Sequence, residues 1–419
     1  MKRVKLVTLG IIMSIYAHAQ QPVTLDGCIE VSYVHLLFDE QSQQIEEGRD
    51  YANEGSKYLN LPGLELSGTS TIQNEQLSIP IAIPGFTAPE APLNFNRLLI
   101  NFNQAIYNGH MASKKRLIDS LAFDEQVQAL EMEKIKIKSQ VIGVYATLLM
   151  VRTNQEILKG HVGVIDKKYD QLKGAVNAGV STKSKLQILE AERLLLQQRR
   201  DELVYNEQSL LNVLSNYTGL VLTTDMELAM PNPELNLSAA LNRPELVLID
   251  AKKEGLGAKK ALVGNARLPY VGVFGSVGLG NPGYNVFDNS IRPMAMAGLV
   301  VKWNIWDWSK TKSEQAQLVV GQSLLEQQRG RTEMVFEREL IKQLSEVEKY
   351  QKLLASDEAI LEAQKIVTAS MSSELSNGTA TASDYTSQLN TELSTKLNKE
   401  LHQIQQMLAI LMYNTIKGN

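Results

Sequence analysis

The chain has 419 residues, of which 44% are hydrophobic, 6% aromatic and 21% charged, and its formal net charge is −4. This length allows a large core and up to about three domains. The acidic balance argues against nucleic acid as a partner, and the aromatic content is low for a catalytic domain of this size.

Residues 1–19, MKRVKLVTLGIIMSIYAHA, contain the basic start, apolar run and small-residue cleavage site of a secretory signal peptide. We expect cleavage after Ala19, which removes three basic and no acidic residues and changes the net charge from −4 to −7. No later stretch reaches ~18 uninterrupted apolar residues, so no transmembrane helix is predicted. The mature chain is therefore expected to be exported, either free in the periplasm or held in an outer membrane by strands.

The single cysteine, Cys28, ends the sequence LDGC, which is similar to a lipoprotein box. An unmodified thiol is the favoured interpretation, because polar residues separate Cys28 from the apolar run and Ala19 already offers a cleavage site. Both interpretations stay open at this point. A single cysteine forms no internal disulfide, so the exported chain must be stabilised by packing or assembly.

Two segments between about residues 62 and 107 alternate apolar and polar side chains, which is typical of strands with one apolar and one polar face. In the first segment, the apolar and polar sets are Leu64, Leu66 and Ile72 against Glu65, Ser67, Thr69 and Thr71. In the second, they are Leu98, Ile100, Phe102 and Ile106 against Asn101 and Asn103.

A coiled-coil seam follows, because apolar residues recur every seven positions from Phe123 to Leu172. A second series with the same step runs from Val141 to Val176 and is interrupted at Gln155. A helix over about 112–177 would be roughly 100 Å long at about 1.5 Å per residue.

The sequence NAGVSTKSKLQ interrupts this helix and begins another. Gly179 can end the first helix in the left-handed conformation, and Ser181 or Thr182 can cap the second. Heptads then continue from Leu189 to Tyr217. A short turn between two long helices predicts an antiparallel hairpin over about 112–219.

The second half repeats this organisation. Two strand-like segments over about 268–308, RLPYVGVFGSVGLG and AMAGLVVKWNIWDW, precede a heptad series that begins at Leu340. The stretch SNGTATASDYTSQLN matches NAGVSTKSKLQILEA, so that Gly179 aligns with Gly378 and Gly219 with Gly418, each 199 residues apart. We predict an internal duplication, with a first repeat over 20–219, a link over 220–246, and a second repeat over 247–419 whose hairpin covers about 310–416.

The apolar faces of the predicted strands lack an obvious protein cover, because the neighbouring helices are occupied by their own seams. Aromatic residues at the strand ends, Tyr107, Trp303, Trp306 and Trp308, are typical of an interfacial belt and favour that role over a ligand cage. About ten residues per strand match a tilted bilayer crossing. Four strands cannot close a barrel and an open edge is not tolerated in lipid, so two, three or four copies must assemble.

Several further stretches carry a resemblance to a known family: VTLDGCIEV after the signal peptide, QAIYNG, YDQLKGAVNAGVSTKSKLQILEAERLLLQ, LNRPELVLIDAKKEGLGAKKALVGNARLPYVGVFGSVG and VVKWNIWDWSKTKSEQAQ. Through them the chain resembles the TolC-like outer-membrane efflux family over almost all of residues 20–419. The resemblance implies a homotrimer that forms one twelve-stranded barrel in outer-membrane lipid and a periplasmic tunnel of helical hairpins. It also implies that a periplasmic adaptor protein and an inner-membrane pump are partners, in an efflux or type I secretion system.

The resemblance further implies roles for the hairpin turns. The adaptor-docking tips would be Gly179, Val180, Ser181 and Thr182 in the first repeat and Gly378, Thr379, Ala380 and Thr381 in the second. The acidic residues that narrow the tunnel mouth in the family correspond to Asp384 and, as a departure, Ser387. The alternative for Asp384 is a carboxylate at a helix start, where the helix dipole favours it.

The alternative function is a soluble periplasmic coiled-coil scaffold or adaptor whose strands form a small separate domain. An enzyme is not predicted, since the histidines are far apart and no motif for metal or nucleophilic chemistry occurs. The glycine-rich stretch GSVGLGNPG lacks the spacing of a phosphate-binding loop and is interpreted as a turn. No cofactor is expected, and the sequence predicts neither the exported substrate nor the type of pump.

Overall fold

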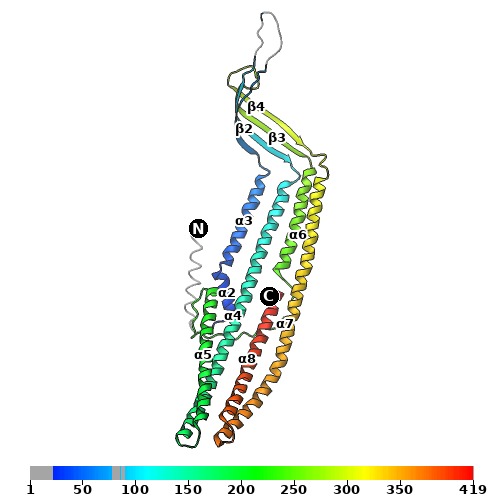
Figure 1. Cartoon of the computed structure of the whole chain (residues 1–419). Coiled ribbons are helices and arrows are strands. Elements are labelled where there is room, and N and C mark those ends of the chain that lie inside the picture. Colours follow the sequence, from blue (N-terminus) through cyan, green and yellow to red (C-terminus); the bar gives the residue numbers. More distant parts are fainter. Residues whose placement is uncertain (1–21, 78–84, 86–89, 419) are drawn as a thin grey trace. The chain divides into compact units, whose positions relative to one another are not determined.

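The computed structural model describes residues 22–77, 85 and 90–418, and Figure 1 labels most of their helices and strands. The predicted signal peptide, residues 1–19, lies outside the described residues. The chain divides into two compact units. The strand unit comprises residues 43–128 and 247–330, and the hairpin unit comprises the described residues of the remainder. No helix among the described residues is long and apolar enough to cross a membrane.

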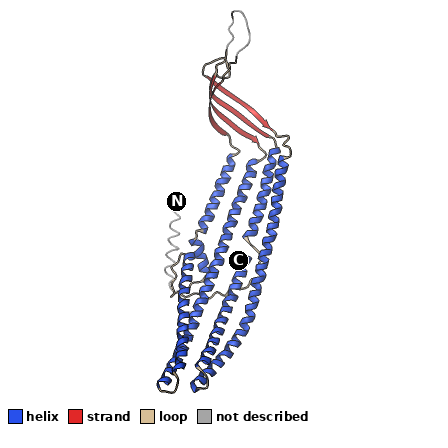
Figure 2. Cartoon of the chain, viewed as in Figure 1, coloured by secondary structure: helices blue, strands red, loops and turns tan. Residues whose placement is uncertain are grey.

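The strand unit contains one four-stranded antiparallel sheet in the order β1-β2-β3-β4 (Figure 2). Its strands are β1 (Gly63–Ile72), β2 (Asn94–Tyr107), β3 (Tyr270–Asn281) and β4 (Arg292–Lys302). Helical elements in this unit are most of α3 (Phe38–Tyr58), most of α6 (Pro244–Val263), the 3₁₀ helix η1 (Gly264–Arg267) and the first turns of α4 and α7.

The fourth strand is shorter than the alternation in the sequence suggests. The pattern continues through Trp303 and Ile305, but β4 ends at Lys302. Lys302 pairs with Tyr270, the first residue of β3, and the chain before Tyr270 is occupied by η1, so no strand remains for a longer β4 to pair with. Trp303 instead donates a 3.1 Å hydrogen bond from Nε1 to the carbonyl of Arg267.

The hairpin unit contains α2 (Leu25–His35) and most of two long helical hairpins. The first hairpin is α4 (Met111–Asn177) with α5 (Lys183–Thr218), and the second is α7 (Lys310–Asn377) with α8 (Ala382–Lys417). The predicted seams are buried in their central parts, where Leu148, Ile165, Leu189 and Leu196 are each 0% exposed. The two hairpins also share one hydrophobic cluster, in which Leu389 and Leu393 of α8 join Ile165 and Leu189.

The internal duplication is confirmed by the backbone. Residues in the left-handed conformation recur 199 positions apart, as the pairs Gly109 and Trp308, His110 and Ser309, Gly179 and Gly378, and Gly219 and Gly418. Both ends of α5 and α8 are offset by the same 199 residues. Three of these eight residues are not glycine, although the left-handed conformation costs other residues about 1–2 kcal/mol. The turn geometry is therefore retained even where the sequence has changed.

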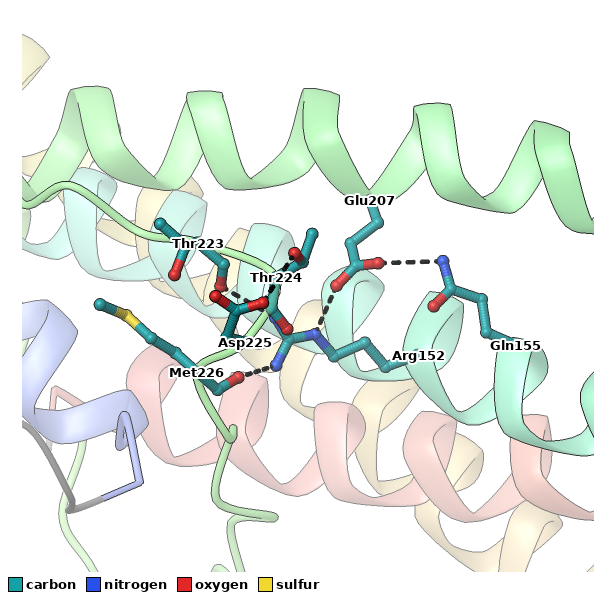
Figure 3. A network of polar contacts seen from close by, with 7 residues as sticks. All are labelled: Arg152, Gln155, Glu207, Thr223, Thr224, Asp225 and Met226. Carbon is teal, nitrogen blue, oxygen red and sulfur yellow. Dashed lines mark hydrogen bonds and ion pairs between the residues drawn. The ribbon is translucent and has the colours of Figure 1, made fainter.

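The interruption of the first seam at Gln155 has a structural cause (Figure 3). Glu207 of α5 is buried there, and its carboxylate accepts hydrogen bonds from Arg152 Nε at 2.7 Å and from Gln155 Nε2 at 3.0 Å. The same guanidinium donates to backbone carbonyls of the inter-repeat link, at Met226, Thr223 and Thr224. Polar contacts therefore replace the apolar seam contact at Gln155, and the ion pair attaches the link to the first hairpin.

A second arginine attaches the far end of the link to the second hairpin. The guanidinium of Arg243 is buried, donates a 3.0 Å hydrogen bond to the carbonyl of Thr415, and lies 4.6 Å from the centre of the Phe336 ring. Glu245 accepts two further hydrogen bonds from the same group. Both ends of the link are thus held by hydrogen-bonded arginines inside the hairpin unit.

Cys28 is a core residue. Its side chain is 1% exposed within α2, and desolvation by burial raises the pKa of the thiol to about 11. Upstream, Val23 forms a β-bridge with Leu228, and its carbonyl accepts a 2.7 Å hydrogen bond from the Tyr145 hydroxyl. A lipoprotein that began at Cys28 would lack these contacts, and its thiol would have to leave the core, which agrees with the unmodified thiol favoured above.

Candidate functional site: the two faces of the sheet and the two hairpin turns

The strand register gives the sheet one apolar and one polar face. Side chains of cross-strand partners point to the same face of a sheet, so each row of partners can be assigned to one side. The apolar rows are Leu64–Phe102–Gly275–Ala297, Leu66–Ile100–Val277–Ala295 and Gly68–Leu98–Leu279–Pro293. The rows between them are Glu65–Asn101–Ser276–Met296, Ser67–Leu99–Gly278–Met294 and Thr69–Arg97–Gly280–Arg292. The predicted alternation is clear in β1 and in most of β2, whereas β3 and β4 place small residues, Met294 and Met296 on the face opposite the apolar rows.

The apolar face is exposed in the single chain. Leu66, Leu299 and Val301 are 69%, 72% and 68% exposed, although each lies within a strand. Such a contiguous apolar surface is unusual on a monomer in water and indicates that something else covers it.

The polar face combines hydrogen-bonding side chains on β1 and β2 with small residues and a few larger apolar ones, such as Phe274 and Met296, on β3 and β4. Asn101 donates a 2.7 Å hydrogen bond to the hydroxyl of Ser67 across β1 and β2. The ring of Phe274 lies over Gly298, where a Cβ atom would come within 2.7 Å of the ring. Any larger side chain at position 298 would therefore force the ring of Phe274 to move.

Both outer strands of the sheet have one free edge. Among the described residues, β1 pairs only with β2 and β4 pairs only with β3. Three successive antiparallel pairings make β1 and β4 run in opposite directions. The free edge of β4 in one copy could consequently extend the same antiparallel pattern by pairing with β1 of another copy.

The aromatic residues predicted for a belt lie at one end of the sheet. Tyr107 ends β2, while Trp303, Trp306 and Trp308 follow the end of β4, and these two strands run in the same direction. The three tryptophans are 58%, 71% and 86% exposed. Trp306 and Trp308 make an edge-to-face contact with ring centres 5.8 Å apart. The position at a strand end suits a belt, and the role itself stays a prediction.

The turn of the first hairpin exposes an apolar side chain. Gly179 has φ 76°, and the amide of Val180 donates a 2.9 Å hydrogen bond to the carbonyl of Ala175, which closes the end of α4. The side chain of Val180 is 78% exposed. Thr182 is the N-cap residue of α5, yet its hydroxyl makes no capping hydrogen bond.

The turn of the second hairpin has the same backbone but different side-chain contacts. Gly378 has φ 78°, and the amide of Thr379 donates a 3.0 Å hydrogen bond to the carbonyl of Glu374. Ala380 is only 9% exposed. Thr381 and Asp384 form a complete capping box, in which the threonine hydroxyl accepts from the Asp384 amide at 3.1 Å.

The capping box engages the carboxylate predicted to narrow the tunnel mouth. Asp384 Oδ2 accepts hydrogen bonds from the Thr381 hydroxyl at 2.5 Å and from the Thr381 amide at 3.1 Å. These bonds hold the pKa of the Asp384 carboxyl below its usual range. Ser387 lies three residues further along α8 and is also exposed, so helical spacing brings the two predicted residues together. The capping alternative for Asp384 is thus realised, while the gate role stays a prediction.

A buried lysine that sequence reasoning missed connects the two hairpins near their turns. Lys168 of α4 is 8% exposed and donates to the Ser372 carbonyl and the Ser376 hydroxyl of α7, both at 2.9 Å. Its ammonium also lies 5.5 Å from the centre of the Tyr385 ring, and desolvation by burial lowers its pKa. The heptad pattern gives no signal for Lys168, because its partners belong to the other repeat. Within the described residues, no cluster of three His, Cys, Asp or Glu side chains is arranged to hold a metal ion.

Comparisons with known proteins identify the fold. No protein-family model matches the sequence, and no curated protein is detectably similar to it. Solved structures are similar, however. The outer membrane protein VceC from Vibrio cholerae has a TM-score of 0.71 at 13% sequence identity, over 94% of this chain and 96% of that chain.

Two outer membrane channels give comparable results. The CmeC channel of Campylobacter jejuni has a TM-score of 0.70 at 13% identity, over 94% of this chain and 85% of its own. The open state of the Neisseria gonorrhoeae MtrE channel has a TM-score of 0.70 at 12% identity, over 94% of this chain and 88% of its own. These likenesses confirm the TolC-like fold, with long helical hairpins and four strands per chain.

Proposed function

We propose that this chain, with its TolC-like fold, forms an outer-membrane channel that passes substrates from the periplasm to the exterior. Three copies would form a twelve-stranded barrel, and their helical hairpins would form a periplasmic tunnel. In this proposal a periplasmic adaptor protein and an inner-membrane pump deliver the substrate, in an efflux or a type I secretion system. The channel itself needs no cofactor and performs no catalysis.

One observation carries the proposal: a four-stranded sheet with a continuous exposed apolar face, a polar opposite face and two free edges. Lipid would cover the apolar face and water would fill the space against the polar one. A free strand edge leaves backbone groups unpaired, which is costly in hydrocarbon, so the sheet must close on itself through other copies.

The direction of the strands supports closure by identical copies. Because β1 and β4 are antiparallel, pairing β4 of one copy with β1 of the next would continue the pattern without a break. Each copy adds four strands, and three copies give the twelve-stranded barrel of the TolC-like family that the sequence resembles. The tryptophans after β4 would then form an aromatic belt at the periplasmic boundary of the barrel.

The hairpins supply the proposed tunnel and its contacts. We propose that residues 20–219 and 247–419 act as two structural repeats joined by the link over 220–246. The turns beginning at Gly179 and Gly378 would dock the adaptor, with Val180 as the exposed apolar contact of the first turn. Asp384 and Ser387, both exposed at the start of α8, would face the tunnel mouth.

A pair of adjacent substitutions in β1 tests the proposal. Leu66 lies on the apolar face and Ser67 on the polar face, and both belong to the same strand. Leu66→Glu would place a charge in lipid, where lysine or arginine costs about 2–4 kcal/mol near the membrane centre and glutamate costs less. Ser67→Glu would place the same charge in water. The measurements are the amount of protein in the outer-membrane fraction and the ionic conductance of purified protein in planar bilayers.

We expect the wild type and Ser67→Glu to reach the outer membrane and conduct ions, and Leu66→Glu to fail in both. Equal behaviour of the two variants would contradict the assignment of the faces. Recovery of all mature wild-type protein from the soluble periplasm, without conductance, would instead favour the scaffold alternative.

A further inference from the structure

The polar face of the sheet carries three charged side chains without a partner. Glu65, Arg97 and Lys302 lie on this face, and in the part of the chain that the structure describes none of them forms an ion pair. The residues without described positions between β1 and β2, 78–84 and 86–89, include no acidic residue that could neutralise Arg97.

The cross-strand neighbours of Arg97 are uncharged, and Glu75 and Glu90 in the connection between β1 and β2 form no ion pair with it in the described part of the chain. The cross-strand partners of Arg97 are Thr69 on β1 and Gly280 on β3, and the sulfur of Met294 lies over Gly280. The Arg97 Cγ atom is 3.6 Å from where a Cβ of residue 280 would be. Glu65 is four residues from Thr69 along β1, about 13 Å at the rise of a strand. That separation exceeds the Debye length of about 10 Å at 0.1 M salt but not that of about 30 Å at 0.01 M salt, so Glu65 offsets part of the Arg97 field only at low salt.

A second arginine at the same level is neutralised. Arg292 lies in the same row of the sheet as Arg97, but it donates a 2.7 Å hydrogen bond from Nε to Asp288 Oδ2, and a second nitrogen lies 2.6 Å from that oxygen. The Arg292–Asp288 pair contributes no net charge. The uncompensated charge in this row is therefore the guanidinium of Arg97 alone.

We propose that Arg97 is a specificity-determining residue that makes the outer part of the barrel lumen favour anionic solutes over cationic ones. This inference rests on the proposed function, because the barrel creates the lumen and three copies place three Arg97 side chains in one ring. Rings of basic side chains select anions in pores. The solutes favoured would be organic anions that carry carboxylate or phosphate groups.

The expected size of the effect follows from the charges. Three unit charges about 10 Å from the axis would by themselves enrich a monovalent anion about fourfold at 10 mM salt, and the opposing Glu65 carboxylates reduce this to about twofold. At 150 mM salt the enrichment falls below about twofold. Selectivity should therefore be modest, as suits a wide channel, and should decline as salt is added.

The test measures reversal potentials of purified trimers in planar bilayers under a potassium chloride gradient with a dilute side of 10 mM. We expect the wild type to pass chloride better than potassium. Arg97→Gln should lower the chloride-to-potassium permeability ratio by at least about twofold, and Arg97→Glu should shift the preference to potassium. The matched control is Asp288→Asn combined with Arg292→Gln, which removes a charge pair from the same level without changing the net charge and should leave the ratio unchanged.

The outcomes separate this inference from the channel proposal. Absence of any conductance in the wild type would contradict the channel itself. Conductance with the same permeability ratio in the wild type and both Arg97 variants would overturn only the inference about Arg97. An equal change in the double control would also overturn it, because net charge would then not be the cause.

Discussion

The two hairpin turns differ in their side chains but share one backbone. Each turn places a glycine in the left-handed conformation, with φ 76° at Gly179 and 78° at Gly378, and no other atom lies within 4 Å of the place where a Cβ would be. The first turn exposes Val180, whereas the second closes with the Thr381–Asp384 capping box. After duplication, the requirement for a left-handed residue has kept the backbone constant while the side chains around it changed.

The same contrast appears in the middle of the hairpins. The first hairpin contains the buried network of Arg152, Gln155 and Glu207. The residues 199 positions later are Gln351, Leu354 and Gln406, none of which carries a charge. The first hairpin thus holds the link through an ion pair, and the second retains an apolar residue where the seam of the first is interrupted.

The largest difference between the hairpins should appear when Glu207 is removed. Glu207→Ala would leave the Arg152 guanidinium largely buried without its carboxylate, and breaking a buried ion pair costs about 3–5 kcal/mol. Gln406→Ala, the matched change in the second hairpin, should cost less than about 1 kcal/mol. Guanidinium chloride unfolding, followed by circular dichroism, measures both. Replacing the pair by Arg152→Gln with Glu207→Gln should recover part of the loss, and equal costs for the two single variants would refute the contrast.

Substitution of the turn glycines should instead show that the two turns have the same backbone. Gly179→Ala and Gly378→Ala each force a side chain into the left-handed conformation, which costs about 1–2 kcal/mol. Because both sites are open, no clash adds to this cost, and the two changes in the free energy of unfolding should be equal within error. A clear inequality would show that the turns are not equivalent.

Removal of the N-cap hydroxyl should change the stability of the two turns by different amounts, and this difference should be smaller than that between the hairpins. Thr381→Ala removes a side-chain cap and should destabilise the chain by about 1 kcal/mol. Thr182→Ala removes a hydroxyl that makes no capping hydrogen bond and should have almost no effect. Thermal unfolding of both variants, compared with the wild type, measures the difference, and a loss of stability with Thr182→Ala would contradict it.

The smallest effect should be a pH dependence confined to the second turn. Hydrogen bonds from Thr381 lower the pKa of Asp384 in the folded chain, so this group stabilises the fold above its unfolded pKa. That contribution is lost as the pH falls through the lower, folded pKa. The stability advantage of the wild type over Asp384→Asn should therefore shrink below about pH 4. Lys185, which lies 199 residues before Asp384, provides the control: Lys185→Gln should show no such change over this range.

The sequence predicts the helices well because their signals are local. Heptads and left-handed glycines place α4 and α5 within a residue or two of their observed ends. The end of β4 at Lys302 is not predicted, because it is set by where its partner β3 begins. The contacts of Lys168 and the isolated charge of Arg97 are not predicted from the sequence either. Both depend on residues far away in the chain that only the fold brings near.

The free edges of β1 and β4 have a genetic consequence. In the proposed ring, every copy pairs with its two neighbours through both edges. One copy with a damaged edge would therefore prevent the ring from closing. If normal and damaged copies were made in equal amounts and mixed at random, only about one trimer in eight would contain three normal copies. Alleles that damage either edge should thus be dominant, whereas alleles that only prevent synthesis of the chain should be recessive.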